Sequence, residues 1–209
     1  MNIVVFGASG ATGRHVVGQA LQAGHTVVAF CRNPAKLNLV HERLTSIQGD
    51  VSDFGAVERA VRGADAVLSA LGVGRPLKPD PTVVEGVRNI VTAMEKTDRR
   101  KFVYLSTNAV AENRQDAGFL IRNIVAKIAR HEISDHEKKE EIVKKSSIDW
   151  IIVRAPGLTN GAGSGSVKSG VDIRPSSILP MMPRADVAAF MLSQLTDARY
   201  IRKPVRIFR

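Results

Sequence analysis

Three glycines near the amino terminus, Gly7, Gly10 and Gly13, stand three residues apart directly after the apolar run Ile3–Phe6. Glycines at this spacing permit a tight turn off a strand, a close approach of backbone to a pyrophosphate, and close packing of helix on strand. The free N–H groups at the start of the following helix attract the phosphates. Glycine triplets alone are weak signals, but a strand before, a helix after and a second apolar run, Thr26–Phe30, make a dinucleotide-binding loop the prediction.

The end of the second apolar run indicates which dinucleotide binds. Sites specific for NAD usually place an acid there, about 20 residues beyond the glycines, to hold the ribose 2′-hydroxyl. This chain has Arg32 instead, whose fork of donors suits a 2′-phosphate, and Lys36 adds a second positive charge. We therefore expect NADP(H) as the cofactor. The alternative is that Arg32 is an ordinary exposed arginine at a strand end.

Apolar runs alternate with helical patterns along the 209 residues. This alternation predicts one Rossmann-like α/β domain over residues 1–209, with a doubly wound parallel sheet and helices on both faces. The expected strands are Asn2–Phe6, Thr26–Phe30, Leu44–Gln48, Ala66–Ala70, Lys101–Leu105, Trp150–Val153 and Val205–Phe208. The expected helices are Arg14–Ala23, Phe54–Val61, Thr82–Lys96 and Ser134–Ser146.

Three irregular stretches, 73–81, 111–133 and 159–183, follow expected strands, where ligands bind in open α/β sheets. We expect them to form the substrate side. The first offers Arg75 and Lys78 to an acidic acceptor. The apolar stripe of the second favours a helix packed on the body over a lid. The glycine-rich part of the third, Asn160–Gly170, either closes over a ligand or is a disordered surface loop.

The net charge of +10 first suggests a polyanion as partner. The basic clusters, however, lie at expected helix ends and faces without interleaved aromatic residues, which favours solvated faces and no specific nucleic-acid binding. They are Arg99–Lys101, Lys138–Lys139, Lys144–Lys145 and Arg202–Lys203.

The single cysteine, Cys31, excludes an internal disulfide, and no apolar run approaches the length of a membrane span. We expect a soluble, cytoplasmic protein without a metal site or membrane contact, most simply a monomer. We also expect Cys31, Trp150, Met181 and Met182 to pack in the core.

Asp50 ends the third expected strand. Its carboxylate either accepts a hydrogen bond from an adenine amino group or caps the following helix, as Ser52 or Asp53 also could.

Motifs spread over the whole chain resemble the atypical short-chain dehydrogenase/reductase superfamily, in the NAD(P)-binding group that includes biliverdin reductase B, also called flavin reductase. The glycine motif is common to the superfamily, whereas Glu-Gly-x-Arg-Asn-Ile-Val followed by Asp-His is more particular to the reductase. The segments that carry the resemblance are Gly7–Gly13, Arg32, Gly49–Val51, Glu85–Val91, Ser106–Ala109, Asp135–His136 and Val153–Gly157.

The resemblance implies roles for residues along the cofactor. Around the pyrophosphate it matches Gly7, Ser9, Gly10 and Thr12, within a loop that also contains Ala11 and Gly13. Arg32 matches the 2′-phosphate contact, and Asp50 and Val51 match the adenine wall. Positions nearer the nicotinamide are Leu71, Gly72, His136, Gly157 and Leu158. For His136 this implies a hydrogen bond to the nicotinamide ribose; an ordinary helix-surface histidine is the alternative.

The superfamily's Tyr-x-x-x-Lys pair and serine, which serve as acid/base machinery in its alcohol dehydrogenases and sugar epimerases, are replaced. Glu132 stands at the tyrosine position, His136 at the lysine position and Asn108 at the serine position. The chain's two tyrosines, Tyr104 and Tyr200, begin no such motif. An ordinary carbonyl reductase or epimerase is therefore disfavoured.

A conjugated acceptor needs less acid/base help than a simple ketone, so positioning can suffice. The expected function is NADPH-dependent hydride transfer to a flavin or a biliverdin-like acceptor, with Thr107 and Asn108 lining the pocket and any flavin acting as substrate. Two alternatives are an NmrA-like NADP-binding sensor without turnover, and a reductase of a quinone or another small molecule.

Overall fold

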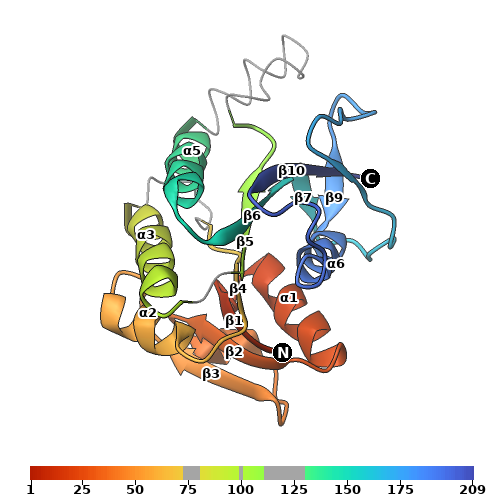
Figure 1. Cartoon of the computed structure of the whole chain (residues 1–209). Coiled ribbons are helices and arrows are strands. Elements are labelled where there is room, and N and C mark those ends of the chain that lie inside the picture. Colours follow the sequence, from red (N-terminus) through yellow and green to blue (C-terminus); the bar gives the residue numbers. More distant parts are fainter. Residues whose placement is uncertain (73–80, 99–100, 111–129) are drawn as a thin grey trace.

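The computed structural model describes residues 1–72, 81–98, 101–110 and 130–209 (Figure 1). Residues 73–80 and 111–129, which hold Arg75, Lys78 and most of the second irregular stretch, lie outside the described residues. The strands are β1 (Asn2–Phe6), β2 (Thr26–Cys31), β3 (Leu44–Gln48), β4 (Ala66–Ser69), β5 (Lys101–Thr107), β6 (Asp149–Ala155), β7 (Gly157–Thr159), β8 (Lys168–Gly170), β9 (Met181–Pro183) and β10 (Lys203–Phe208). The helices are α1 (Ala11–Gln22), the 3₁₀ turn η1 (Pro34–Leu37), α2 (Phe54–Val61), α3 (Pro81–Lys96), α5 (Arg130–Lys145) and α6 (Arg184–Ser193).

The main sheet has the strand order β3-β2-β1-β4-β5-β6-β10-β8. Its neighbouring strands are parallel except for β10 and β8, which are antiparallel. The chain leaves β1 toward β2 and β3 on one side and crosses to β4 on the other, so the order reverses between β1 and β4. This is the doubly wound arrangement expected from the sequence, and its reversal point is where such sheets bind ligands.

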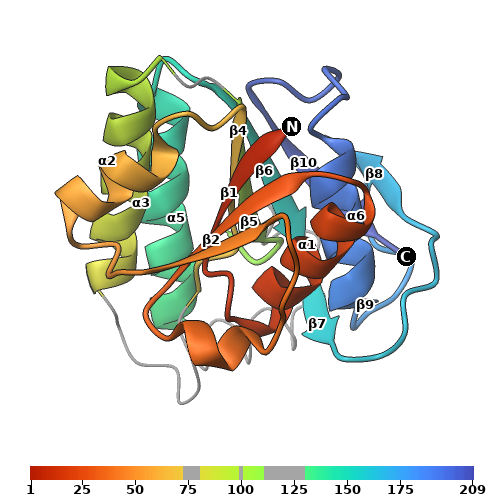
Figure 2. The same ribbon diagram turned by 90° about the horizontal axis from the view of Figure 1, so that it is seen from below.

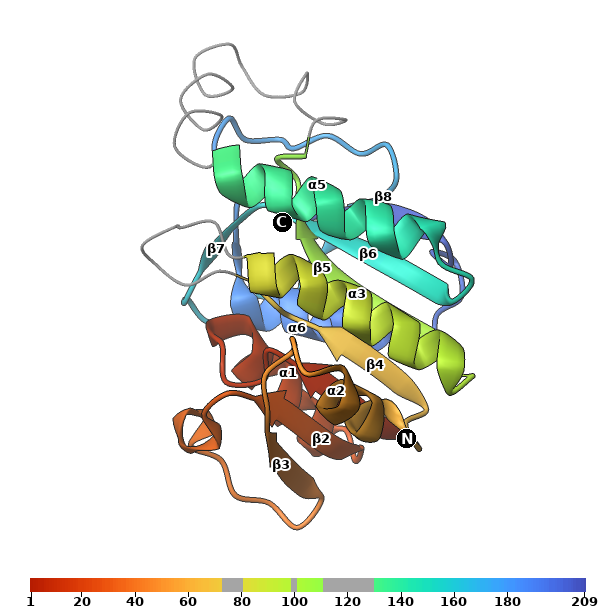
Figure 3. The same ribbon diagram turned by 90° about the vertical axis from the view of Figure 1, so that its left-hand side faces the viewer.

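Helices cover both faces of the sheet. Helices α1 and α6 pack together on one face, and α2, α3 and α5 lie side by side on the other (Figures 2 and 3). Alternate residues of β1 feed the two layers: Ile3 and Val5 belong to the core under α1 and α6, whereas Val4 and Phe6 belong to the core under α2, α3 and α5. Both faces of the central strands are therefore buried, which explains their continuous apolar runs.

The seven expected strands and four expected helices are present, most of them with shifted ends. Helix α1 begins at Ala11 rather than Arg14, and α5 begins at Arg130 rather than Ser134, so the last residues of the second irregular stretch are helical. The sequence reading missed α6 and the short strands β7, β8 and β9. Lys168–Gly170 of the glycine-rich stretch forms β8 and pairs with β10.

Cys31, Trp150 and Met182 are buried, as expected, but Met181 is 43% exposed and does not belong to the core. The two methionines point to opposite sides of a short strand, so only one can face inward. No helix among the described residues is long and apolar enough to cross a membrane.

A buried ion pair fastens α5 to the sheet. The Arg154 guanidinium on β6 donates from Nε to Glu140 Oε1 (3.0 Å) and from Nη2 to Oε2 (2.6 Å), and Ser106 Oγ on β5 donates to Oε1 (2.7 Å). Lys139, next to Glu140, is only 1% exposed. The expectation that Lys138–Lys139 forms a solvated face is therefore wrong for Lys139, because α5 turns its side chain inward while Lys138 remains exposed.

We predict that Glu140→Gln lowers the free energy of unfolding by about 3 kcal/mol, because it leaves the buried Arg154 guanidinium without its carboxylate. Urea unfolding followed by circular dichroism measures the change. Glu141→Gln is the matched control, since Glu141 is exposed on the same helix and pairs with Lys145 at the surface. Equal behaviour of the two variants would contradict a stabilising role for the buried pair.

Candidate functional site

The glycine-rich loop after β1 is packed so closely that side chains would not fit. Gly7 has φ +73°, and a Cβ atom there would lie 2.8 Å from the carbonyl oxygen of Ala70 at the end of β4. A Cβ atom on Gly13 would lie 2.1 Å from the carbonyl oxygen of Gly7. The loop therefore brings bare backbone to the reversal point between β1 and β4.

Helix α1 begins at this point with its first N–H groups uncapped. Gly10 occupies the N-cap position, no side chain caps the helix, and its first turn contains no acidic residue. The N–H groups of a first turn have no acceptor within the helix, so they attract an anion. Ser9 is half-buried and Ala11 exposed beside them, while Thr12 is buried. The cradle fits the pyrophosphate of a dinucleotide.

The end of β2 is basic. Arg32 and Lys36 are exposed, and Asn33 between them caps η1 by accepting from the Ala35 N–H (3.1 Å). Arg14 of α1 reaches the same turn, since its Nη1 donates to the Lys36 carbonyl oxygen at 3.4 Å. Three positive side chains thus come from α1, the end of β2 and η1. These basic surroundings fit a ribose 2′-phosphate better than a free 2′-hydroxyl, which an acidic residue would hold.

Asp50, after β3, forms a local turn and does not cap α2. Its Oδ1 accepts from the backbone N–H (2.9 Å) and hydroxyl (2.7 Å) of Ser52. These two hydrogen bonds hold the pKa of Asp50 below its usual value, and the nearby Arg32 charge adds to the effect. The helix cap is Asp53, whose Oδ1 accepts from the Ala56 N–H (3.0 Å). Of the two alternatives raised for Asp50, capping is therefore wrong.

Helix α3 holds this turn in place. Asn89 Nδ2 donates to the carbonyl oxygens of Val51 (2.9 Å) and Ser52 (3.2 Å). Gly86 makes room for Val51, because a Cβ atom there would lie 2.4 Å from Val51 Cγ2. The segment Glu85–Val91 carries part of the family resemblance and lies in the expected helix Thr82–Lys96, but neither reveals this positioning role. A glycine inside a helical pattern was the available signal.

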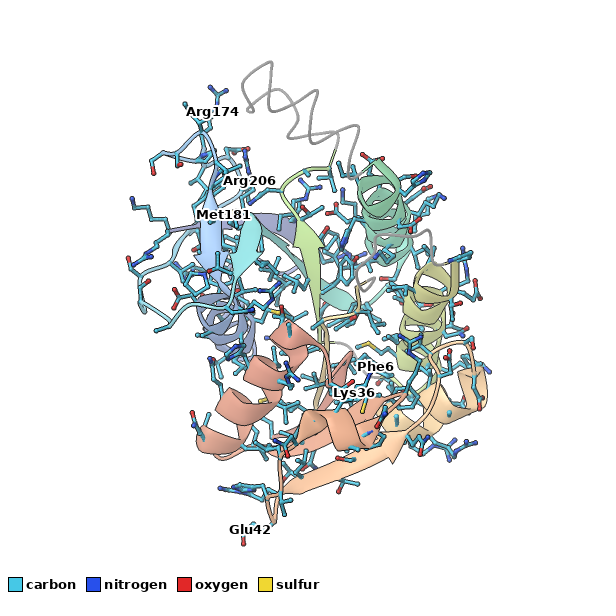
Figure 4. All side chains as sticks on the ribbon, turned by 180° about the vertical axis from the view of Figure 1, so that it is seen from behind. Phe6, Lys36, Glu42, Arg174, Met181 and Arg206 are labelled. Carbon is cyan, nitrogen blue, oxygen red and sulfur yellow. The ribbon has the colours of Figure 1, made fainter. Side chains whose placement is uncertain are left out.

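The ends of β4, β5 and β6 complete the edge. A Cβ atom on Gly72 would meet open space, and Leu71 packs against the core. Thr107 Oγ1 accepts from the Ala109 N–H (3.2 Å). The Asn108 side chain instead faces β10, with Oδ1 accepting from Arg206 Nε (3.3 Å). Asn108, which follows β5, is thus held by its own side chain to β10, the strand on the far side of β6; Arg206 is labelled in Figure 4.

Gly157 and Leu158 lie on β7, which continues directly from the end of β6. Gly157 is exposed, and a Cβ atom there would lie 2.4 Å from Met181 Sδ. Leu158 is half-buried and pairs with Met182 of β9. Both residues, which are expected near the nicotinamide, therefore contact β9 of the third irregular stretch.

His136 is a buried residue of α5 and not a helix-surface histidine. It is 7% exposed, and its Nδ1 lies 2.9 Å from the hydroxyl of Tyr104, which is fully buried on β5. Burial, reinforced by the Lys139 charge, holds the pKa of His136 well below its usual value. Burial and the charges of Glu140 and Asp135 raise the pKa of Tyr104 well above its usual value. Both rings are neutral near pH 7.

Tyr104 begins no Tyr-x-x-x-Lys motif, so the sequence gives no reason to single it out. Its contact with His136 joins a strand to a helix 32 residues later, so no local spacing could reveal it.

The glycine-rich stretch Asn160–Gly170 is anchored to α6. Asp186, 3% exposed, accepts from the backbone N–H groups of Ser164 (2.9 Å) and Gly165 (3.0 Å) and from the Ser164 hydroxyl (2.9 Å). Burial alone would raise the pKa of Asp186, but these hydrogen bonds outweigh it and lower the pKa. The sequence predicts either a loop that closes over a ligand or a disordered loop, and neither prediction includes these hydrogen bonds to Asp186.

Two surface hollows of about 370 and 400 Å³ are lined by α5 with Val110 and Arg154, and by α3 with α5. Neither is lined by the glycine-rich loop. Among the described residues, no group of three or more His, Cys, Asp or Glu side chains could hold a metal ion.

Several curated proteins are similar to this chain over part of their length. A (4-alkanoyl-5-oxo-2,5-dihydrofuran-3-yl)methyl phosphate reductase from Streptomyces griseus is 30% identical over 205 residues, 93% of this chain and 63% of that protein. A 3-beta-hydroxysteroid dehydrogenase from Mycolicibacterium neoaurum is 32% identical over 54% of this chain and 34% of its own length. The photosystem II assembly factor Ycf39 from Synechocystis is 26% identical over 77% of this chain and 46% of its own length. The chain thus spans between about a third and two thirds of these relatives.

Solved structures share the fold over the whole chain. The oxidoreductase ylbE from Lactococcus lactis has a TM-score of 0.84 at 17% identity and is covered over 91% of its chain. ChuY, an anaerobilin reductase from Escherichia coli O157:H7, has a TM-score of 0.78 at 20% identity and is covered over 97%. A short-chain dehydrogenase/reductase from Veillonella parvula in complex with NADP has a TM-score of 0.78 at 16% identity and is covered over 94%.

The family model described as NAD(P)H-binding matches residues 7–198, from the first glycine of the loop to just beyond α6. This match and the relatives support the expected place in the atypical short-chain dehydrogenase/reductase group. The chain belongs to the NAD(P)H-binding family.

Proposed function

We propose that this protein is an NADPH-dependent reductase that transfers hydride to a flavin or a biliverdin-like conjugated acceptor. One observation carries the proposal. The glycine-rich loop that would hold the dinucleotide is intact, whereas the lysine position of the usual acid/base motif holds His136, which is buried and hydrogen-bonded to Tyr104. Such a site can position two reactants but has lost the usual proton donor. A conjugated acceptor, which takes its proton from solvent, suits it best.

The cofactor would lie along the carboxyl edge of the sheet. The loop residues Gly7, Ser9, Gly10, Ala11, Thr12 and Gly13 would surround the pyrophosphate. Arg32 and Lys36 would bind the 2′-phosphate, and Asp50 and Val51 would line the adenine. Leu71, Gly72, His136, Gly157 and Leu158 would lie nearer the nicotinamide. The edge runs from the basic turn of Lys36 to the segment of Met181, which are well separated in Figure 4.

When bound, the cofactor supplies the hydride from nicotinamide C4. The chain's own contribution is to fix the two rings at hydride distance and to exclude water. Thr107 and Asn108 would line the acceptor pocket. Apolar side chains on the third irregular stretch, Ile178 (79% exposed), Leu179 (64%) and Met181 (43%), offer a surface that a planar acceptor would cover. We assign stretches 73–81, 111–133 and 159–183 to this acceptor side of a single domain.

The name of the Streptomyces relative supports reductase chemistry. The name of Ycf39, an assembly factor, favours a second candidate, an NADP-binding regulator that acts through a protein partner without turnover.

Turnover separates these candidates. We predict that the purified protein oxidises NADPH in the presence of flavin mononucleotide or biliverdin, and faster than with simple ketones, measured as the loss of absorbance at the reduced nicotinamide band. Quinones belong in the same panel, since fastest turnover with them would favour the quinone reductase alternative. Tight NADPH binding with no oxidation across the panel would falsify the reductase proposal and support the regulator.

Arg32→Ala tests the choice of cofactor. Loss of a charge-assisted contact to the 2′-phosphate should raise the KM for NADPH about tenfold, equivalent to about 1.4 kcal/mol, and leave the KM for NADH unchanged. Arg62→Ala removes the same charge from an exposed position directly after α2, where Arg62 pairs with Glu58, and serves as the control. An unchanged preference for NADPH in Arg32→Ala means that Arg32 is an ordinary surface arginine.

Gly13→Ala tests the cradle. The added Cβ atom would collide with the Gly7 carbonyl oxygen, so the loop must move, and we expect NADPH affinity to fall at least tenfold in a fluorescence titration. Gly18→Ala places the same methyl group on α1 in open space and should leave the affinity intact. If both variants bind like the wild type, the phosphates lie elsewhere.

A further inference from the structure

The contact between Tyr104 and His136 fixes where the protons of both side chains lie. The Tyr104 hydroxyl has one hydrogen to donate, and His136 Nδ1, at 2.9 Å, is its one hydrogen-bond partner among the described residues. If Nδ1 carried the proton and donated it, the hydroxyl hydrogen of the fully buried Tyr104 would have no acceptor among the described residues. Leaving a buried donor unpaired is costly, so Tyr104 donates and Nδ1 accepts.

This assignment determines the histidine tautomer. A neutral imidazole carries one proton, so accepting at Nδ1 puts that proton on Nε2. The charged groups around the pair are Asp135, Lys139 and Glu140 from α5 itself and Arg154 from β6, and Arg154 is already paired with Glu140. Neutral rings avoid adding a charge to this crowded interior.

The Nε2 atom remains available. No described residue accepts a hydrogen bond from it, and it is not among the fully buried polar atoms that lack a partner, which are Ser69 Oγ, Asp135 Oδ2, Trp150 Nε1 and Gln194 Oε1. Helix α5 runs antiparallel to the strands because it leads into β6, so its first turns lie at the carboxyl edge of the sheet. His136, in the second turn of α5, therefore lies toward the carboxyl edge, where the nicotinamide half is proposed to bind.

We propose that Tyr104 is a positioning residue, which holds His136 in the Nε2–H tautomer and so makes it a fixed, uncharged hydrogen-bond donor to the cofactor. The direction of this donor rests on the proposed function, whereas the tautomer does not. His136 would take over the cofactor-binding role of the lysine that it replaces, but without a positive charge. Because Tyr104 is fully buried, its hydroxyl acts through His136 and does not reach an acceptor.

Nitrogen NMR of the cofactor-free protein tests the tautomer directly. With ¹⁵N-labelled histidine, long-range spectra distinguish a protonated from an unprotonated ring nitrogen, and His136→Gln identifies the signals among the five histidines. We expect His136 to have its proton on Nε2 alone, and Tyr104→Phe to populate the Nδ1–H form. Tyr200→Phe removes the other tyrosine hydroxyl, which lies near Ser169, and should change nothing. A proton on Nδ1 in the wild type, or an unchanged spectrum in Tyr104→Phe, would overturn the proposal.

A double-mutant cycle on the dissociation constant for NADPH tests the positioning role. A glutamine amide can place an N–H near the position of Nε2 without needing Tyr104. We expect Tyr104→Phe to weaken binding about fivefold, near 1 kcal/mol, in the wild type and to have no further effect in His136→Gln. If Tyr104→Phe weakened NADPH binding by the same factor in His136→Gln as in the wild type, Tyr104 would act on packing alone and not through His136. Since neither measurement needs turnover, a failed acceptor screen would leave both outcomes readable.

Discussion

The fold is organised around the close packing of backbone against backbone where the loop after β1 leads into α1, which leaves no room for side chains at Gly7 and Gly13. A methyl group on Gly13 would lie 2.1 Å from the Gly7 carbonyl, and one on Gly7 would lie 2.8 Å from that of Ala70. The proposed phosphate site is therefore made of backbone and of a helix terminus, which any dinucleotide can use. Selectivity between dinucleotides must then come from side chains at neighbouring strand ends. The basic turn after β2 supplies such side chains, and Asn89 of α3, the asparagine clamp, holds the turn after β3 in place.

The central fold was predictable because strands buried on both faces read as continuous apolar runs. The bounds of β1, β3 and α2 agree with the sequence reading residue for residue. Helix α6 was missed for a physical reason: it follows β9 without a polar loop, and a carboxylate, Asp186, lies among its buried residues. Strand β8 was missed because three residues, Lys168–Gly170, become a strand only through pairing with β10.

The candidate site was predictable only where one short segment carries the whole signal. The glycine spacing and Arg32 are local, and the structure agrees with their expected places at the loop and the strand end. The Asn89 clamp and the Tyr104–His136 contact join segments more than 30 residues apart, so their partners are set by the packing of helices on the sheet. For Asp50 and Asp53, the sequence left two carboxylates competing for one helix terminus, and only the backbone geometry decided it.

The environment of Tyr104 also bears on which acceptors suit this protein. An acidic tyrosine needs a nearby positive charge to lower its pKa. Tyr104 has the reverse: burial and the carboxylates of Glu140 and Asp135 raise its pKa, and the lysine position beside it holds a neutral histidine. Its hydroxyl therefore remains protonated and serves as a structural donor. On the proposed function, hydride transfer then depends on the acceptor's own capacity to stabilise the added electrons, which conjugated rings possess and simple ketones lack.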